Sequence, residues 1–182
     1  MSKEAFERIV SELLIAIDLC LTNGLRTTGL LLLYASIDIM AWLSRPKEKS
    51  DVTSEDFIWW VNEYLLPNTR LPCSAEELWA ARCGLIHSYA PESKHTRTRK
   101  VRKIFYAFSP GQAEDLQKVI DRGYPYPTLA VQAEDLFGAY RDGIEQFKQI
   151  LSNDLSQARI VYKRAGKSFK FIPLSRLRGG AP

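Results

Sequence analysis

Hydrophobic side chains recur at three- and four-residue steps along the first part of the chain. Between residues 3 and 22 they fall on one side of a helical projection, at Phe6, Ile9, Val10, Leu13, Leu14, Ile17 and Leu21. This is the period of a helix with one buried face. Asn23-Gly24 supplies the left-handed stop that such a helix commonly needs. We therefore expect a helix over 3–22, followed by a tight turn.

The next segment is apolar nearly all round. It runs from a cap at Thr27 or Thr28 to Leu43, and Pro46 ends it. A helix without a polar face is typical of the centre of a bundle. The segment contains Asp38 and falls short of the roughly 18 to 20 residues that a membrane helix requires. We expect a buried helix and no membrane association, with a polar partner for Asp38, because an unpaired buried carboxylate is destabilising.

Capping residues delimit the middle of the chain. The run 53–56, Thr-Ser-Glu-Asp, indicates the start of a short helix that Pro67 closes. Ser74 and Glu77 have the spacing of a capping box, in which each side chain bonds to the other residue's backbone. This spacing predicts a helix from Ser74 to about Tyr89.

The second half predicts another long helix and a different tail. Residues 101–108 mix β-branched, aromatic and basic side chains, compatible with a strand, an extended arm or a short helix. A helix is expected over 112–121, then a rigid loop at 123–127 with two pre-proline positions. Thr128 is expected to cap a helix to about Leu151. The tail alternates in two-residue steps over 159–163 and 168–172, which predicts a small hairpin.

These elements predict a mainly all-α fold. The four longest helices favour an antiparallel four-helix bundle, with extra short helices and a small C-terminal β-hairpin. With 182 residues, the chain has the size of one domain. We divide it into a helical bundle domain, 1–154, and a basic C-terminal extension, 155–182, packed on the same domain.

The cysteines and the first residues bear on location and cofactors. Three cysteines, Cys20, Cys73 and Cys83, lie at wide spacings that match no structural zinc site. The first residues include acids and lead into an amphipathic pattern, unlike a secretion signal. We expect a cytoplasmic protein with no metal and no cofactor.

Positive charge is concentrated in two segments. The chain carries a net charge of +4. Between residues 94 and 103 there is no acid, and after Asp154 seven further basic residues again occur without one. Such acid-free runs are typical of solvated loops or of surfaces that bind polyanions. Our candidate RNA-binding residues are those of the first run: Lys94, Arg97, Arg99, Lys100, Arg102 and Lys103.

The candidate chemistry lies at the end of the helix predicted over 74–89. Arg82, His87 and Tyr89 are spaced as Arg-x4-His-x-Tyr. On a regular helix, Arg82 and His87 point about 140° apart and differ by about 7.5 Å in height, so one helix does not easily bring them together. Either the helix loosens near Gly84, or two copies meet around a two-fold axis and line one cleft, and we favour the dimer.

At these residues the chain resembles the HEPN superfamily, helical bundles that carry Arg-x4-6-His and include metal-independent ribonucleases, many of them toxins. The resemblance implies that Arg82 binds the scissile phosphate and that His87 transfers protons during attack by a ribose 2′-hydroxyl. In the narrower Arg-x4-His-x-Tyr form it implies that Tyr89 is the target of a nucleotidyltransferase-type antitoxin. Family members usually place Asn, Asp or His directly after the arginine. This chain has Cys83 there, a weaker hydrogen-bonding group.

We therefore take Arg82, His87 and Tyr89 as candidate catalytic residues, supported by Asp38 and Cys83, in a homodimeric endoribonuclease acting on RNA. Structural interpretations stay open beside this one. Arg82 could simply pair with Glu77 or Asp38, and Trp59, Trp60 and Trp79 are expected in the core or a dimer interface. The alternative function is a non-catalytic helical module that binds RNA or protein, and the third is a purely structural interaction domain.

Overall fold

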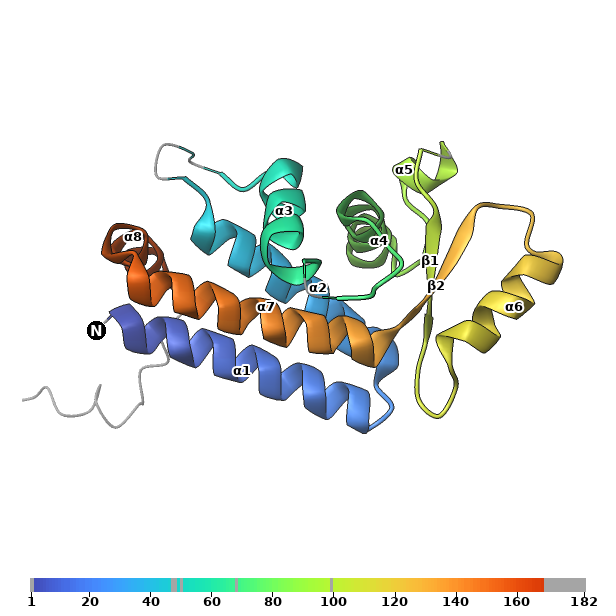
Figure 1. Ribbon diagram of the computed structural model, residues 1–182, viewed down its shortest axis with the longest axis horizontal. Helices are drawn as coiled ribbons and strands as arrows, with labels where there is room; N and C mark the ends of the chain where they lie inside the picture. Colours follow the sequence, from blue (N-terminus) through green and yellow to red (C-terminus); the bar gives the residue numbers. More distant parts are fainter. Residues whose placement is uncertain (1, 47–48, 50, 68, 99, 169–182) are drawn as a thin grey trace, which may run out of the picture.

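The computed structural model describes residues 2–46, 49, 51–67, 69–98 and 100–168. It is mainly helical, as predicted, and carries one small sheet (Figure 1). The described helices are α1 (Ser2–Thr22), α2 (Arg26–Ser44), α3 (Ser54–Trp60) with its π-helical continuation η1 (Val61–Leu65), α4 (Ala75–Ser88), α5 (Lys94–Arg97), α6 (Ala113–Gly123), α7 (Ala133–Asn153) and α8 (Leu155–Ala165). The strands are β1 (Lys103–Ala107) and β2 (Thr128–Gln132).

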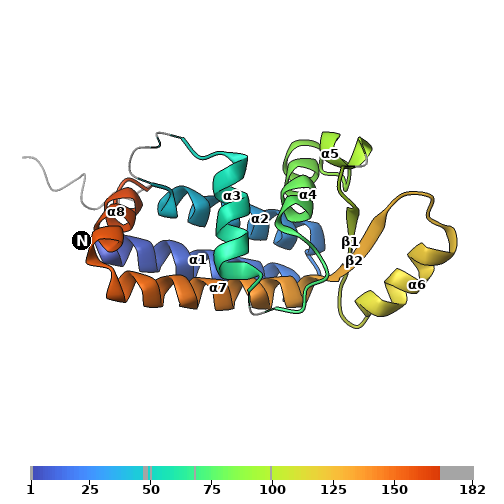
Figure 2. The same cartoon turned by 45° about the horizontal axis from the view of Figure 1, so that its top comes forward.

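Three long helices form the base of the molecule. α1 and α2 pack together as an antiparallel pair, and α7 runs back along α1. Phe6 of α1 meets Phe147 of α7 edge to face, with 6.2 Å between ring centroids. α3 and α4 stand steeply across these helices, as Figure 2 shows. α4 thereby points one end away from the base, toward α5 and the sheet.

One continuous hydrophobic core joins these helices. Its largest fully buried side chains include Trp60, Tyr34, Tyr140 and Phe57. Among the described residues, α2 is long and apolar enough to cross a membrane by length and composition, but 56% of that window is buried inside the protein. Helix α2 is therefore compatible with the core helix of a soluble protein.

The sheet corrects one prediction. β1 and β2 pair in parallel, with register running from Lys103 opposite Thr128 to Ala107 opposite Gln132. Thr128 therefore begins a strand and caps no helix, and α7 starts four residues later than predicted, at Ala133 with Gln132 at its N-cap. Residues 128–132 form a strand and not the start of the helix because residues 103–107 pair with them. The local pattern of hydrophobic residues does not contain this distant partner.

The C-terminal hairpin is also wrong in its first strand, because residues 155–165 form helix α8. The carboxylate of Asp154 caps this helix, accepting hydrogen bonds from the backbone of Ser156 at 2.9 Å and Gln157 at 3.0 Å. Ala158, Val161 and Ala165 are buried at three- and four-residue spacing. Burial of one face of the helix therefore decides the structure of this segment, although its sequence alternates in two-residue steps. Of the predicted second strand, 168–172, residues 169–172 lie outside the described residues.

The described part of the basic extension is integral to the fold. α8 packs against α1, α2 and α7. The guanidinium of Arg164 is buried and donates from Nη1 to the carbonyl of Leu43 and from Nη2 to that of Pro46, both at 2.9 Å. These bonds satisfy carbonyls at and just beyond the end of α2. The positive charge of Arg164 therefore stabilises the fold and does not lie on the surface for a polyanion to bind.

Candidate functional site

Helix α4 carries the motif, and its first turn forms as predicted. The hydroxyl of Ser74 accepts from the backbone of Glu77 at 3.3 Å, and the Glu77 carboxylate accepts from the backbone of Ser74 at 2.9 Å. This capping box satisfies two of the backbone N–H groups that a helix start leaves free. The capping box fixes where α4 begins.

The other end of α4 turns sharply at Tyr89. The backbone of Tyr89 is left-handed, with φ of 51°, and its N–H donates to the carbonyl of Leu85 at 3.0 Å. The N–H of Ala90 reaches back to the carbonyl of Gly84 at 3.4 Å. Left-handed residues other than glycine are strained by about 1 kcal/mol or more, and such outliers cluster at functional sites. Tyr89 therefore ends the helix in a conformation that the surrounding structure enforces.

Gly84 allows the chain to fold back on the helix. A Cβ atom at this position would lie 2.6 Å from the carbonyl oxygen of Ala90 and 2.8 Å from that of Glu92. Both contacts involve backbone, which cannot swing away. Gly84 is therefore a close-approach position inside a helix that stays α-helical through it. Loosening of the helix near Gly84, the alternative that we did not favour, does not occur.

Arg82 and His87 meet within one chain. Nη1 of Arg82 lies 3.3 Å from Nε2 of His87. The expectation that one helix does not easily bring them together was wrong, because it compared the directions in which the two residues leave the helix and neglected the length of the arginine side chain. Neither a loosened helix nor a second copy is needed for this contact.

Asp38 holds the other side of the guanidinium. Its Oδ2 lies 2.6 Å from Nη2 and 2.8 Å from Nε of Arg82, so the pair joins α2 to α4. Both side chains are largely but not fully buried, with 18% of Arg82 and 20% of Asp38 exposed. Each terminal nitrogen of arginine carries two N–H groups, so Arg82 can hold Asp38 and still offer a donor to an anion. Burial raises the pKa of Asp38, although the neighbouring Arg82 opposes this effect.

Trp79 completes the support of Arg82. The guanidinium carbon lies over the Trp79 ring, 5.0 Å from its centroid. The indole was expected in the core or an interface, and its contact with the motif was missed. The signal was available, because residues three apart on a helix are neighbours. Arg82 is thus held by a carboxylate, an imidazole and an aromatic face.

The other two motif residues differ in exposure. Tyr89 is 63% exposed, so its ring is accessible at the surface. Cys83 is only partly exposed, and burial raises the pKa of its thiol despite the positive charge of Arg82. The thiol therefore stays neutral at neutral pH and can offer only weak hydrogen bonds. His87, Ser88 and Tyr89 together form an exposed tip at the end of α4.

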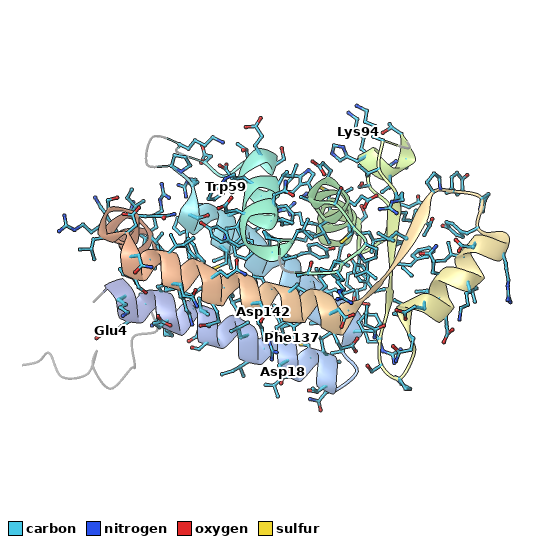
Figure 3. The ribbon with its side chains drawn as sticks, viewed as in Figure 1. Glu4, Asp18, Trp59, Lys94, Phe137 and Asp142 are labelled. Atoms are coloured by element: carbon cyan, nitrogen blue, oxygen red, sulfur yellow. The ribbon has the colours of Figure 1, made fainter. Side chains whose placement is uncertain are left out.

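The basic run divides into two kinds of residue. Lys94, Arg97 and Lys100 are exposed on and after α5, and Figure 3 shows Lys94 at the outer tip of the molecule. Nε of Arg102 lies 2.6 Å from the Glu77 carboxylate, and Nζ of Lys103 lies 2.6 Å from that of Glu92. Lys103 is buried, which removes it from direct contact with a polyanion in this conformation. Arg99 lies outside the described residues.

One groove on the surface lies away from the motif. It has a volume of about 900 Å³ and lies between the 69–72 connector, β2, α6 and α7, and its lining residues include neither Arg82 nor His87. Among the described residues, no group of three or more His, Cys, Asp or Glu side chains is placed to hold a metal ion. The motif is therefore a surface arrangement at the tip of α4, next to α5.

Comparison with known proteins assigns the chain to no family, since no family model, no curated protein and no solved structure matches it.

Proposed function

We propose that this chain is a HEPN-like, metal-independent endoribonuclease that acts as a homodimer in the cytoplasm. The observation that carries the proposal is the contact of Arg82 with His87 at 3.3 Å, at a tip where His87 is exposed. A fixed cation beside a proton-transferring imidazole is suited to a phosphodiester, whose reaction develops negative charge on the phosphate oxygens. An open surface also suits a polymer better than an enclosed small molecule.

The two side chains have different tasks in this proposal. The 2′-hydroxyl of the ribose attacks the adjacent phosphorus, and its proton passes to a base. The bond from phosphorus to the 5′-oxygen of the next nucleotide breaks, and that oxygen receives a proton from an acid. Arg82 stabilises the charge on the phosphate, and His87 transfers a proton. The products are a 2′,3′-cyclic phosphate and a 5′-hydroxyl.

A second copy of the chain would supply the second proton-transfer group. One motif contains one histidine, whereas the reaction needs a base and an acid. Two motifs related by a two-fold axis provide two imidazoles and two guanidinium groups at one cleft. Light scattering on the purified protein should give the mass of a dimer, and an excess of His87→Ala protein mixed with the wild type should lower the activity of the wild type, because a mixed dimer holds only one His87 imidazole.

The resemblance also suggests a partner. We propose that the protein is the toxic half of a toxin–antitoxin or defence pair, inhibited by a nucleotidyltransferase-type antitoxin that modifies Tyr89. The exposed ring of Tyr89, next to His87 on the tip of α4, supports this role. A bulky, negatively charged group at Tyr89 would occupy the space that the RNA needs and compete for the positive charge of Arg82.

The direct test is RNA cleavage in EDTA. The wild type should yield cyclic-phosphate and 5′-hydroxyl ends, and a 2′-deoxy substitution at the cleaved position should block the reaction. Arg82→Ala and His87→Ala should each lose most of the activity. His95→Ala, which removes the other histidine, and Arg159→Ala, on the distant helix α8, are matched controls that should stay active. Full cleavage by both motif variants would overturn the proposal.

The second candidate function is a non-catalytic module that binds RNA or protein. The ion pair of Arg82 with Asp38 favours it, because the pair joins two helices and so gives the arginine a structural role. Binding of RNA by the wild type without any cleavage would select this alternative. It predicts that Arg82→Ala lowers stability while leaving RNA affinity dependent on Lys94, Arg97 and Lys100.

A further inference from the structure

The parallel sheet brings two distant segments together. Because β1 and β2 run in the same direction, the segments that precede them meet at the same end of the sheet. Before β1 lie α5, with the exposed Lys94 and Arg97, and Lys100 after it. Before β2 lies the loop 123–127, Gly-Tyr-Pro-Tyr-Pro. Both segments lie toward that end in Figure 1. The topology therefore places aromatic and basic side chains at one edge of the molecule.

Three aromatic rings cluster there around one lysine. The Phe105 and Tyr124 rings meet edge to face with centroids 5.2 Å apart, and Tyr126 lies 6.1 Å from Tyr124. Nζ of Lys103 lies 5.4 Å from the Tyr124 centroid, 5.8 Å from that of Tyr126 and 6.0 Å from that of Phe105. Lys103 and Phe105 point to the same side of β1, because side chains alternate along a strand. We call Phe105, Tyr124 and Tyr126 the aromatic platform.

The aromatic platform is held rigidly. Tyr124 and Tyr126 each precede a proline, which restricts their backbones to extended conformations. The carbonyl of Pro127 accepts a hydrogen bond from the backbone of Lys103 at 2.9 Å, and the Tyr124 hydroxyl lies 3.1 Å from Nζ of Lys103. Rings that are fixed before binding lose little entropy when a ligand stacks on them. The three rings are not simply part of the hydrophobic core, since the side chain of Tyr126 is 50% exposed.

The platform lies beside exposed positive charge. Glu92 pairs with the buried Lys103, whereas Lys94, Arg97 and Lys100 are exposed. Exposed rings next to exposed cations are the combination by which proteins bind single-stranded nucleic acid, since the bases stack and the phosphates pair with the cations. A paired duplex hides its base faces, so rings of this kind discriminate against it.

We propose that the aromatic platform stacks on unpaired bases of single-stranded RNA, while Lys94, Arg97 and Lys100 bind its phosphates. This inference rests on the proposed function, because it names the form of RNA that reaches the motif. Glu92 provides the link between the two. Its backbone carbonyl oxygen packs against Gly84 of α4, 2.8 Å from the position of an added Cβ, and its carboxylate accepts a hydrogen bond from Nζ of Lys103, which lies among the rings. The platform is therefore fixed to the helix that carries Arg82 and His87.

The test is RNA binding measured without cleavage. In the His87→Ala background, fluorescence anisotropy would compare a labelled oligouridine with a blunt-ended RNA duplex of the same number of phosphates. The oligouridine should bind more tightly. Tyr126→Ala should weaken its binding by at least about fivefold, the loss expected for one stacked base, and leave duplex binding unchanged. Tyr126→Phe should bind as well as the parent, because stacking uses the ring and not the hydroxyl.

A matched control and a second readout keep the test decisive. Trp59→Ala removes another exposed aromatic residue, on α3 (Figure 3), and should leave binding unchanged. If Tyr126→Ala is unfolded by circular dichroism, ultraviolet cross-linking of the parent to oligouridine should map to Tyr124 or Tyr126. Equal affinity of Tyr126→Ala and its parent, or cross-links only elsewhere, would overturn the proposal. So would an acidic peptide that displaces the oligouridine as effectively as unlabelled RNA does.

The two proposals can fail separately. Tyrosine-dependent binding of single-stranded RNA without cleavage by the wild type would retain the platform and reject the ribonuclease. Cleavage that depends on Arg82 and His87, with no contribution from Tyr126 to binding, would retain the ribonuclease and reject the platform.

Discussion

The imidazole of His87 lies 3.3 Å from the guanidinium of Arg82, five residues earlier on the same helix. A neutral histidine can accept a hydrogen bond from Arg82 through Nε2, whereas a protonated histidine has only donors. Because a guanidinium can only donate, Nε2 of His87 is the acceptor in this contact. Asp38 keeps Arg82 in place on its other side, since it binds Nε and Nη2.

Asp38→Asn should misplace Arg82. The substitution keeps the size of the side chain but removes the charge that orients the guanidinium. We expect the free energy of unfolding to fall by about 1.5 to 3 kcal/mol, the range for a hydrogen bond to a charged group, and RNA cleavage to fall with it. Urea denaturation and initial cleavage rates check both effects. Asp18→Asn on the exposed face of α1 is the control, and equal losses in the two variants would contradict the role of Asp38.

Gly84→Ala should destabilise the protein although alanine favours helices. Inside an unhindered helix, replacing glycine by alanine stabilises by about 1 kcal/mol. At Gly84 the new methyl group meets two backbone oxygens, and overpacking of this kind costs about 1 to 3 kcal/mol.

Gly138 of α7 offers the matched control, because a Cβ there meets nothing within 4 Å. Gly138→Ala should raise the melting temperature and Gly84→Ala should lower it. Shifts of the same sign in thermal melts would show that the close approach of residues 90–92 is absent.

Tyr89→Gly should separate the strain at the tip from the chemistry. Glycine adopts the left-handed conformation freely, so the variant should gain about 1 kcal/mol of stability. Removal of the ring should abolish any modification of Tyr89 by the antitoxin. Tyr89→Phe keeps the strain and removes only the hydroxyl, so its stability should equal that of the wild type. A loss of stability in Tyr89→Gly, measured by urea denaturation, would contradict the strain.

Asp56 should make stability depend on acid pH. Burial alone raises the pKa of this carboxyl, but hydrogen bonds from the Thr53 backbone and from Lys49 and the Thr53 hydroxyl outweigh burial and lower it below 3.8. Since the folded-state pKa lies below the unfolded one, Asp56 stabilises the fold above pH 3.8 and loses this contribution as the pH falls through the folded value.

The corresponding variant is Asp56→Asn, which weakens the cap of α3. It should lose about 1 kcal/mol at neutral pH and approach the wild type in strong acid. Glu55→Gln, at the exposed neighbouring position, should track the wild type throughout. A loss for Asp56→Asn that stays constant with pH in urea titrations would contradict the lowered pKa.

Local signals in the sequence were enough to predict the helices that carry the motif. The Ser74 and Glu77 spacing predicted the start of α4, and the apolar run after Thr28 predicted α2 and its need for a partner at Asp38. Pairing of Arg82 with Asp38 was one of two structural alternatives, and it is confirmed. Choosing it over Glu77 required the packing of α2 on α4, which no local pattern contains.

Features that depend on distant partners were not predictable. Residues 128–132 were predicted as helix because their strand partner lies 25 positions earlier in the chain. The alternation at 159–163 suggested a strand, although burial of Val161 and Ala165 against the long helices makes the segment helical. The contact of Arg82 with His87 within one helix was not expected for a different reason, because the length of the arginine side chain was neglected.

A double-mutant cycle on RNA cleavage tests the central claim most directly. Initial rates on single-stranded RNA in EDTA would be measured for the wild type, Arg82→Ala, His87→Ala and the double variant. If the two side chains act on one phosphodiester as a unit, each single variant loses most of the activity and the double variant is no worse than either. Full activity in either single variant, or losses that multiply in the double variant, would contradict the account.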